Sequence, residues 1–473
     1  MNISRGKKKF YITTSIPYTN APPHIGFALE EVQADVLARW HRKTGSDVFF
    51  LTGTDEHGLK IRKAAEKTGK TPKDFVDGIS KKFSELAESL NISNDDFIRT
   101  TDEERHKPAV EKLWKKIEEN EDIYKKKYKG YYCQGCESFV TEKDLVNGLC
   151  PIHNKKPEFV EEENYFFKLS KHLKDIKKKI EKDEIRIIPE ARKREVLGYM
   201  KAGMDDVSFS RSKDKYWGFE VPGDENQIIY VWGDALPNYI SAIGYFEEDK
   251  LFKKYWPADV HCIGKDILKF HAIVWPAMLL SAGLPLPKSI FVHGFITVAG
   301  QKMSKSLGNV VDPFELIKKY GTDAVRYYLL REILPMEDGD FTIEKFEARH
   351  NSDLASGIGN LVSRVKTMTE KHPLGAGKQS LKMKKEIQKA ENNCQKSLGE
   401  FKFNEALKSI WELISFCDKY IEEKRPWEGK KDSEQTLIDL NFAIDGIAEM
   451  VYPFMPETSN KIKERRTPLF PRL

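Results

Sequence analysis

The first 110 or so residues alternate short runs rich in β-branched and aromatic residues with longer amphipathic segments. Strands are expected at residues 10–15 and 48–55, and helices at residues 28–43 and 58–68. Parallel strands need a long crossover connection, and helices of this length supply it. The pattern therefore predicts an α/β fold with a parallel sheet.

A second stretch of the same kind runs from about residue 228 to residue 334, with strands expected at 260–266 and 289–298. Between the two stretches, residues 118–225 differ in composition, with clustered cysteines, aromatic pairs and a Lys-rich helix. We expect the two α/β stretches to form one Rossmann-type sheet that this segment interrupts.

Strand patterns vanish after about residue 356, and apolar residues then recur at helical spacing. Such stripes predict core packing in an all-α helical bundle. The amphipathic segments lie near residues 345–370, 380–398, 403–424 and 434–450. The four parts expected from these changes are residues 1–117 and 226–345 (the halves of the catalytic sheet), 118–225 (a connective domain) and 346–473 (the bundle).

The composition is 40% hydrophobic and 32% charged, which is ordinary for a soluble globular protein. The best apolar run, 272–280, is short and contains Pro276, so no membrane span is expected. The basic N-terminus has no apolar signal core, and we expect a cytoplasmic protein. The net charge of +5 permits a polyanionic partner without requiring one. Basic runs at 125–130 and 171–182 are of a kind that most often forms a solvated face.

Two loops carry candidate chemistry. "PYTNAPPHIGF" (17–27) delivers His24 and Gly26 to the start of a helix, where unpaired N–H groups attract phosphate and a glycine admits a ligand close to the backbone. "GQKMSKSLGN" (300–309) places two lysines in a glycine-bounded loop that can close over a pyrophosphate. The alternative for the second loop is a solvated turn, but its specific string is rare by chance.

Together, "PYTNAPPHIGF" and "KMSKS" (302–306) resemble the paired signatures of class I aminoacyl-tRNA synthetases. The segments "YVWGDALPNYI" (230–240) and "GKDILKFHAIVWP" (264–276) narrow the resemblance to the methionyl-tRNA synthetases. The resemblance covers essentially the whole chain. It implies that ATP and L-methionine form methionyl-adenylate and pyrophosphate, and that the methionyl group then passes to the terminal adenosine of tRNA(Met).

The resemblance also implies a nucleotide site. His24, Lys302, Lys305 and Asp55 are expected to be catalytic, with Mg²⁺ accompanying ATP. The expected ATP-binding residues are Asn20, His24, Gly26, Glu30, Gly264, Asp266, His293, Ile296 and Lys305. Phe27 departs from the family, in which this signature position is usually His. A phenyl ring cannot donate a hydrogen bond. We therefore expect this departure to affect the rate of adenylation more than the function.

For methionine, the resemblance implies that Asp55 takes the α-ammonium group while apolar and aromatic side chains surround the thioether. Aromatic edges suit a polarizable sulfur, although the same aromatic residues could be mere core. The expected methionine-binding residues are Ile16, Tyr18, Asp55, Trp232, Ala235, Leu236, Tyr239, Ile267 and His271.

Four residues have the spacing of a tetrahedral zinc site: Cys133, Cys136, Cys150 and His153. Because all four ligand positions are filled, we expect one structural Zn²⁺ in a knuckle rather than a catalytic metal. The alternative is a chance cluster of reduced cysteines. The other cysteines lie in apolar segments and are most simply buried.

In the bundle, Asn360 and Arg364 lie four residues apart and so on one helix face, and Trp427 follows a helix. Without the resemblance, Asn360 and Arg364 would be interpreted as a surface pair and Trp427 as a core residue. The resemblance implies instead that these three residues read the CAU anticodon by hydrogen bonding and stacking.

Two other functions compete with this one. A sister class I ligase for leucine, isoleucine or valine would carry a large editing insertion, for which 118–225 is too short. An RNA-binding protein on an inactivated synthetase scaffold is suggested only by Phe27. The sequence closes with "PLFPRL" (468–473), without the dimerisation appendix of some relatives, so a monomer is expected.

Overall fold

The computed structural model describes residues 7–133, 138–140, 142, 145–151, 154–247, 250–303, 308–372, 374–375, 377–430 and 432–473. The chain divides into two compact units, and neither is continuous in sequence. Unit 1 comprises residues up to Pro22 together with 45–85 and 94–292. Unit 2 comprises 23–44, 86–93 and 293–473.

Unit 1 is built on a six-stranded sheet in the order β3-β2-β1-β12-β13-β7. Its strands are β1 (Lys9–Thr13), β2 (Asp47–Thr54), β3 (Asp96–Arg99), β7 (Arg186–Ile188), β12 (Val260–Gly264) and β13 (Ser289–His293). The pairs β1–β2, β1–β12, β2–β3 and β7–β13 are all parallel, which confirms the expected parallel α/β sheet. Every residue of β12 is buried, as in a central parallel strand covered on both faces.

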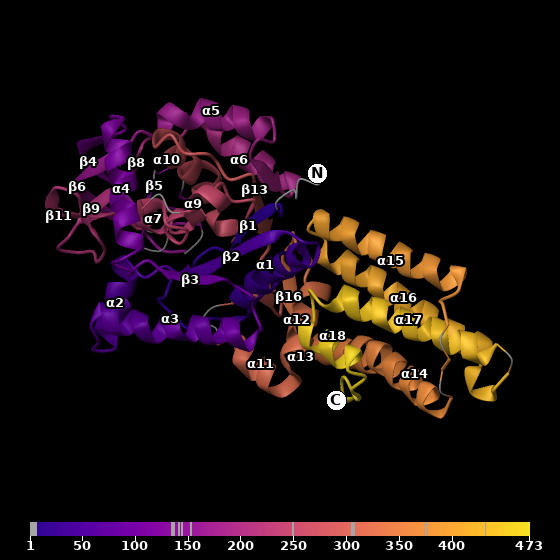
Figure 1. Cartoon of the computed structure of the whole chain (residues 1–473). Helices are drawn as coiled ribbons and strands as arrows, with labels where there is room; N and C mark the ends of the chain where they lie inside the picture. Colours follow the sequence, from indigo (N-terminus) through magenta and orange to yellow (C-terminus); the bar gives the residue numbers. More distant parts are fainter. Residues whose placement is uncertain are drawn as a thin grey trace, which may run out of the picture. The chain divides into compact units, whose positions relative to one another are not determined.

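Helices connect these strands: α2 (Leu59–Lys67), α3 (Pro72–Ser89), α4 (His106–Glu119), α5 (Leu169–Glu181), α6 (Glu190–Ala202), α7 (Val231–Ala235), α8 (Asn238–Ser241), α9 (Lys250–Tyr255), the π-helix η4 (Phe270–Val274) and α10 (Trp275–Ser281). The segment between the sheet halves adds an antiparallel sheet of β5 (Ser138–Val140), β4 (Ile123–Cys133), β6 (Glu158–Phe167) and β8 (Val207–Ser208). A smaller antiparallel sheet contains β10 (Glu220–Val221), β11 (Asp224–Ile229) and β9 (Ser210–Ser212). Figure 1 shows β4 and β6 side by side in this part of unit 1.

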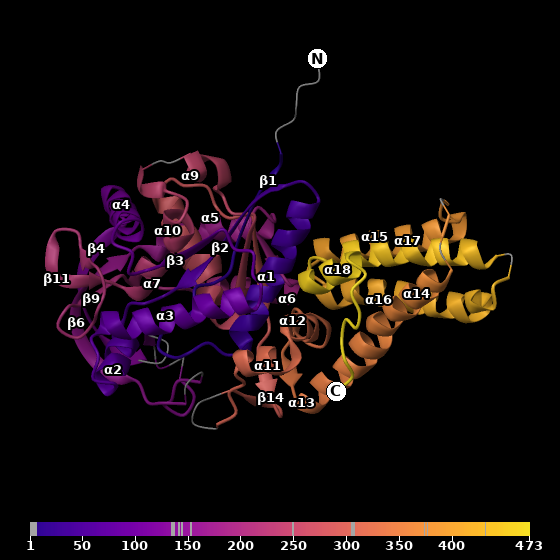
Figure 2. The same ribbon diagram turned by 60° about the horizontal axis from the view of Figure 1, so that its bottom comes forward.

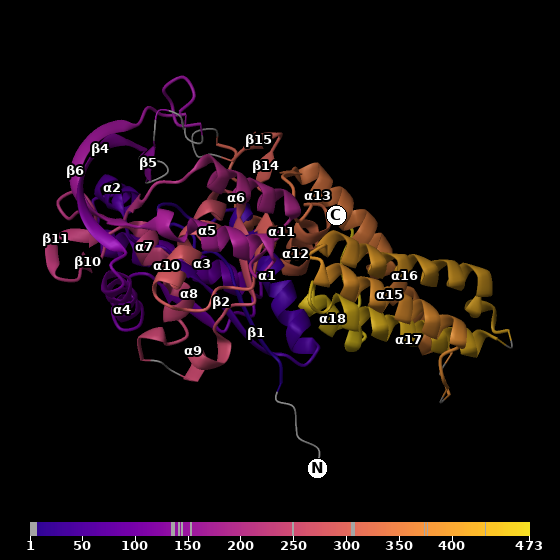
Figure 3. The ribbon, with the colours of Figure 1, turned by 90° about the horizontal axis from the view of Figure 1, so that it is seen from above.

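Unit 2 is largely helical: α1 (Ile25–Lys43), α11 (Pro313–Tyr320), α12 (Thr322–Arg331), α13 (Ile343–Arg349), the π-helix η6 (His350–Gly359), α14 (Asn360–Lys371), α15 (Leu381–Gly399), α16 (Phe403–Lys424), α17 (Ser433–Val451) and α18 (Pro456–Lys463). A small sheet joins β15 (Gln301–Lys302), β14 (Ile296–Val298) and β16 (Gly339–Phe341). Helices α15, α16 and α17 lie side by side (Figures 1 and 3), and α14 packs on α16 (Figure 2). The expected helical bundle is therefore confirmed. No helix in the described part of the chain is long and apolar enough to cross a bilayer.

Two element boundaries differ from the expectations. Helix α1 begins at Ile25 rather than residue 28, because His24 caps it. The single strand expected at 289–298 is two strands, β13 and β14. Between them, the backbone at Gly294 lies so close to the Glu337 carbonyl that a Cβ would be 2.0 Å from its oxygen. Only glycine fits there, and the chain changes sheets at this point.

A buried ion cluster ties unit 2 together. The Asp35 carboxylate of α1 accepts hydrogen bonds from Arg326 of α12 and Arg39, both at 2.7 Å, and from the backbone N–H of Ser93 at 2.8 Å. Arg326 also donates to the carbonyl of Phe454 at 2.8 Å. Burial pushes the pKa of Asp35 upward, but the two arginines and Ser93 outweigh it and hold the pKa below its ordinary value.

Candidate functional site

The expected methionine residues lie in unit 1, and a hydrogen-bonded chain joins three of them. Nδ1 of His271 lies 3.0 Å from the carbonyl oxygen of Ile267, and Nε2 lies 2.7 Å from the hydroxyl of Tyr239. A carbonyl can only accept, so Nδ1 carries the proton. In the neutral ring, Nε2 then accepts from the Tyr239 hydroxyl. Both side chains are almost wholly buried, and these bonds satisfy one another's polar atoms.

Aromatic and aliphatic side chains surround this chain. The indole of Trp232 stacks on Phe270 with ring centroids 3.8 Å apart and stands edge-on to His271. Ala235 and Leu236 are buried in and directly after α7, the short helix that carries Trp232. Six of the nine expected residues meet in one apolar cluster. Leu236 and Tyr239 belong to its buried core, and four partly buried residues pack against it: Ile16, Tyr18, Trp232 and Ile267.

Asp55, expected to hold the α-ammonium group, follows β2 at the carboxyl end of the sheet. Its backbone N–H donates to the Pro17 carbonyl at 2.9 Å, and its carbonyl accepts from the Thr19 N–H at 3.0 Å. Asp55 forms a bridge with Tyr18 and is buried. A buried carboxylate beside the aromatic cluster can bind a substrate ammonium ion. The backbone hydrogen bonds with the loop that follows β1 hold Asp55 in place.

His24 caps α1 in unit 2. Its backbone is extended, and Nδ1 accepts from the Gly26 N–H at 3.0 Å. The ring proton therefore lies on Nε2, which can donate to a ligand. Desolvation lowers the pKa of the imidazole, which favours this neutral form. A Cβ on Gly26 would lie 2.8 Å from the His24 ring, so the cap requires glycine, and the Met303 methyl lies 3.6 Å from the same point. The two signature loops thus meet at the start of α1.

Glu30 and His293, both expected at the nucleotide, also meet in unit 2. Nε2 of His293 lies 2.7 Å from a Glu30 carboxylate oxygen, and Nδ1 lies 2.7 Å from the Gly294 carbonyl. Both ring nitrogens face acceptors, so the geometry fits a protonated ring paired with a carboxylate. Both side chains are buried.

The remaining expected nucleotide residues are more dispersed. Gly264 ends β12 and Asp266 is exposed directly after it, at the carboxyl end of a parallel strand where ligands of open α/β sheets bind. Asn20 is exposed in the loop after β1, and Ile296 is buried in β14. Lys302 lies in β15, but its side chain and the whole of Lys305 are outside the described residues.

The four expected zinc ligands are only partly described. Cys133 ends β4 and Cys150 follows the Val146–Leu149 bridge, and both side chains are buried. Cys136 and His153 lie outside the described residues. Within the described ranges, no group of three or more His, Cys, Asp or Glu side chains is placed to hold a metal. Two buried thiols in this inserted segment fit half of a closed zinc site.

In the bundle, Asn360 begins α14 and is exposed. Arg364 donates to Glu422 at 2.6 Å, which ties α14 to α16. Trp427 is 45% exposed in the short turn after α16, so it is not a core tryptophan. An exposed indole can stack on an unpaired base.

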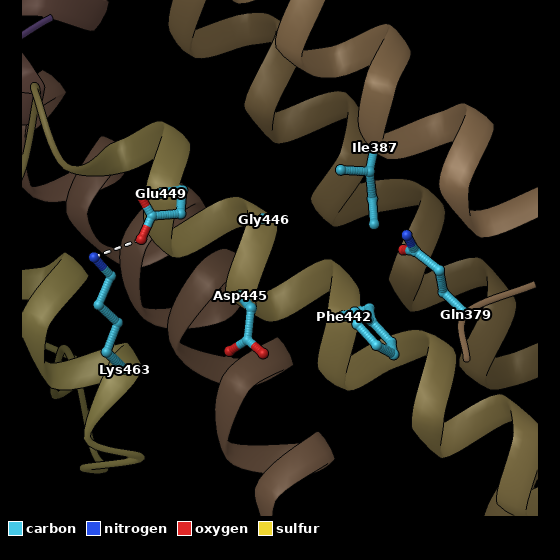
Figure 4. A pocket seen from close by; sticks show the side chains of 7 residues that line it. All are labelled: Gln379, Ile387, Phe442, Asp445, Gly446, Glu449 and Lys463. Atoms are coloured by element: carbon cyan, nitrogen blue, oxygen red, sulfur yellow. Dashed lines mark ion pairs between the residues drawn. The ribbon is translucent and has the colours of Figure 1, made fainter. Parts of the chain in front are cut away.

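A cavity of about 420 Å³ opens between α15, α17 and α18, and none of its lining residues is an expected site residue. Figure 4 shows Ile387 and Phe442 on its apolar side and Asp445, Glu449 and Lys463 on the other. Glu449 pairs with Lys463 at 2.6 Å, and Asp445 pairs with Arg465 at 2.8 Å. Its charges are therefore already neutralised within the protein.

Sequence reasoning missed a second buried cluster behind the methionine residues. Nδ1 of His57 lies 2.7 Å from the Asp234 carboxylate, and Nε2 of His106 lies 2.9 Å from the Asp234 carbonyl. Burial raises the pKa of Asp234, but the two histidines outweigh it and hold the pKa below its ordinary value. Asp234 lies in α7 with Trp232 and Ala235, so the cluster fixes their helix. His57 lies two residues after Asp55, in "GTDEHG" (53–58), but nothing local indicated its distant partner.

Comparison with known proteins agrees with this geometry. The family model described as "tRNA synthetases class I (M)" matches residues 10–156 and 140–366, and the model "Anticodon-binding domain of tRNA ligase" matches 381–467. A methionine–tRNA ligase of Caldanaerobacter subterraneus subsp. tengcongensis is 47% identical, with 97% of this chain and 74% of the relative covered. A methionine–tRNA ligase of Thermotoga maritima is 44% identical, with 97% of this chain and 75% of the relative covered. The chain belongs to the methionyl-tRNA synthetases.

A solved structure is similar throughout. Mycobacterium tuberculosis methionyl-tRNA synthetase in complex with methionyl-adenylate matches with a TM-score of 0.92 and 38% identity, over 97% of this chain and 93% of that one. As a member of this family, the chain is a methionine–tRNA ligase, an aminoacyl-tRNA ligase of class I with a Rossmann-like parallel sheet and a helical C-terminal domain. Membership favours this function over the sister ligase and the inactivated scaffold.

Proposed function

We propose that the buried aromatic cluster of unit 1 binds the methionine side chain and that Asp55 binds its α-ammonium group. The observation that carries this proposal is the chain from Ile267 through His271 to Tyr239, whose polar atoms are satisfied within the protein. Such a wall offers aromatic surface and no unsatisfied charge, which suits a thioether better than a polar side chain. Ile16, Tyr18, Trp232, Ala235 and Leu236 complete the pocket.

For adenylate formation, we propose that the start of α1 receives the ATP phosphates. The Nε2–H of His24 donates to a phosphoryl oxygen, and the dipole of α1 supplies positive potential at its N-terminus. The rest of the nucleotide is held by Asn20, Glu30, Gly264, Asp266, His293 and Ile296. Lys302 and Lys305 bind the departing pyrophosphate, and Mg²⁺ accompanies ATP to neutralise phosphate charge. The methionine carboxylate attacks the α-phosphorus in line, so catalysis is positioning and charge stabilisation.

The adenylate then passes its methionyl group to the terminal adenosine of tRNA(Met). We propose that Asn360, Arg364 and Trp427 read the anticodon, with the exposed Trp427 indole stacking on a base. We also propose that the enzyme acts in the cytoplasm and is a monomer. Light scattering tests the last point, with 54.6 kDa as the expected mass.

We also propose one structural Zn²⁺ held by Cys133, Cys136, Cys150 and His153 in a connective domain of residues 118–225, set between catalytic halves 1–117 and 226–345 and followed by the bundle of 346–473. The burial of Cys133 and Cys150 supports it. Metal analysis of the purified protein should give one zinc per chain, and Cys150→Ser should lose it. Full zinc content in Cys150→Ser would refute the ligand set.

The pocket is tested by Tyr239→Phe, which removes the hydroxyl that His271 accepts from. In methionine-dependent ATP–pyrophosphate exchange, we expect KM for methionine to rise about tenfold while KM for ATP stays unchanged, because one buried hydrogen bond contributes about 1–1.5 kcal/mol. The matched control is Tyr124→Phe, which removes a hydroxyl bonded to Asp206 in the same unit. An equal KM for methionine in wild type and Tyr239→Phe would contradict the assignment.

A further inference from the structure

Three elements of the proposed methionine site are joined by one buried network of side chains. The loop after β2 supplies His57, two residues beyond Asp55. Helix α7 supplies Asp234, and α8 supplies Ser241. His106 of α4 connects these two helices, and α4 packs on α8. All four members of the network are buried.

The hydrogen bonds of this network converge on Asp234. Nδ1 of His57 donates to its carboxylate at 2.7 Å. Nε2 of His106 lies 2.9 Å from the Asp234 carbonyl and 3.3 Å from the carboxylate. A carbonyl can only accept, so this Nε2 carries the proton, and in the neutral ring Nδ1 accepts from the Ser241 hydroxyl 2.8 Å away. Each histidine thus gives Asp234 one donor.

The loop that carries His57 is also fixed on its other side. The preceding residue, Glu56, is fully buried and accepts from Arg99 of β3 at 2.7 and 2.9 Å. The backbone N–H of Glu56 donates to the Thr100 hydroxyl at 2.9 Å. The loop is therefore held to β3 independently of α7, and the contact between His57 and Asp234 ties the helix to this fixed point.

That contact sets a separation which the substrate must match. On one side lies Asp55, which is proposed to bind the α-ammonium group. On the other lie Trp232 and Ala235, which stand on either side of Asp234 in α7 and are proposed to surround the thioether. A fixed run of methylene groups separates these two ends of methionine. A rigid connection therefore favours one chain length, and one methylene more or fewer changes kcat/KM by about 10–200-fold in an apolar pocket.

We propose that His57 is a positioning residue that determines specificity for the length of the amino-acid side chain. It acts through Asp234 rather than by touching the substrate. This rests on the proposed function, because Asp55 and the aromatic cluster must bind the two ends of methionine. The amino acids that this connection disfavours are the thioether homologues with one methylene fewer or one more, S-methylcysteine and homomethionine.

The test compares two substitutions of His57 in the full-length enzyme. His57→Phe keeps a ring between Trp217 and Phe219, whose ring centroids lie 4.8 and 4.7 Å from that of His57, but it removes the N–H donor. His57→Asn keeps a donor, because its side-chain amide carries N–H groups near the position of Nδ1. The matched control is His172→Phe, which breaks another buried histidine–aspartate contact of unit 1, 2.8 Å long, with Asp122.

ATP–pyrophosphate exchange is measured with methionine, S-methylcysteine and homomethionine supplied one at a time. For His57→Phe we expect KM for methionine to rise about tenfold or more with KM for ATP unchanged, since the lost hydrogen bond involves a charged group. The preference for methionine over each homologue should fall about threefold or more. His57→Asn should restore this preference, and His172→Phe should keep it. If His57→Phe does not fold, Ser241→Ala, which removes the partner of His106, should lower the preference about twofold or more.

Wild-type KM and preference in folded His57→Phe would overturn the proposal. So would an equal loss toward all three amino acids, the same change in His172→Phe, a preference that His57→Asn does not restore, or an unchanged preference in Ser241→Ala. Absent methionine-dependent exchange in the wild type, or a wild-type KM for methionine in Asp55→Asn, would instead reject the proposed function.

Discussion

At the scale of the residue, His24 has two tasks that substitutions can separate. Alanine removes both the helix cap and the Nε2–H donor, whereas asparagine can cap α1 through its side-chain oxygen. We predict that His24→Ala lowers the exchange rate by 10²–10³-fold, since an aligned transition-state donor is worth this much. His24→Asn should keep the unfolding free energy of wild type and still lose activity. Wild-type exchange in His24→Ala would exclude the residue from the chemistry.

Phe27 is the residue at which the signature departs from the family. Phe27 is 9% exposed in the first turn of α1, directly after the glycine that the cap requires. A histidine there can add one hydrogen bond to a charged group, worth about 1.5–3 kcal/mol. We predict that Phe27→His accelerates exchange at least tenfold, with pre-steady-state adenylate formation as the measurement. An unchanged rate would mean that His24 and the helix terminus suffice.

His261 gives unit 1 a dependence on pH. The ring is fully buried 2.8 Å from the Thr13 hydroxyl, and desolvation, with His271 as a smaller cause, lowers its pKa well below the usual value. The His261 ring therefore binds a proton more tightly in the unfolded chain than in the folded one. Its contribution to the free energy of unfolding is fully present above about pH 6.5. Below that pH, the free energy of unfolding falls by up to about 1.4 kcal/mol per pH unit. Urea unfolding between pH 7.5 and 5.5 measures this. His261→Gln should flatten the slope, while exposed His372→Gln should leave it unchanged.

At the scale of the element, α1 depends on its buried carboxylate. Asp35→Asn leaves the fully buried Arg326 without its counter-ion, and we predict a loss of about 3–5 kcal/mol in unfolding free energy. The control is Glu449→Gln, an exposed partner of Lys43, which should cost at most about 1 kcal/mol. Denaturant unfolding compares the two. Equal losses would show that the buried pair adds nothing beyond a surface pair.

Elements with a strong local pattern were predictable from sequence. The helices near 403–424 and 434–450 and the strand at 48–55 agree within a few residues, because apolar periodicity alone sets them. The break after β13 was not predictable, since it depends on a backbone contact with Glu337, more than 40 residues away. The His57–Asp234 pair is 177 residues apart and left no local signal either.

At the scale of the whole molecule, the signature loops and pocket segments predicted the family, because short motifs carry that information directly. They did not predict that α1 would belong to the same compact unit as the C-terminal helices. That grouping depends on contacts such as Asp35 with Arg326, 291 residues apart in the chain. Pairings at this separation leave no periodicity for a local reading to find.

The aromatic pocket of unit 1 is proposed as the place where this enzyme activates methionine. The most direct measurement is ATP–pyrophosphate exchange by the zinc-loaded protein with methionine, leucine, isoleucine and valine supplied one at a time. Exchange with methionine, exceeding that with each aliphatic amino acid by at least tenfold, is the predicted result, because a hydrophobic pocket discriminates by about 1–3 kcal/mol per methylene-sized difference. Exchange with none of the four by a folded protein, or equal exchange with leucine, would show that this pocket does not select methionine.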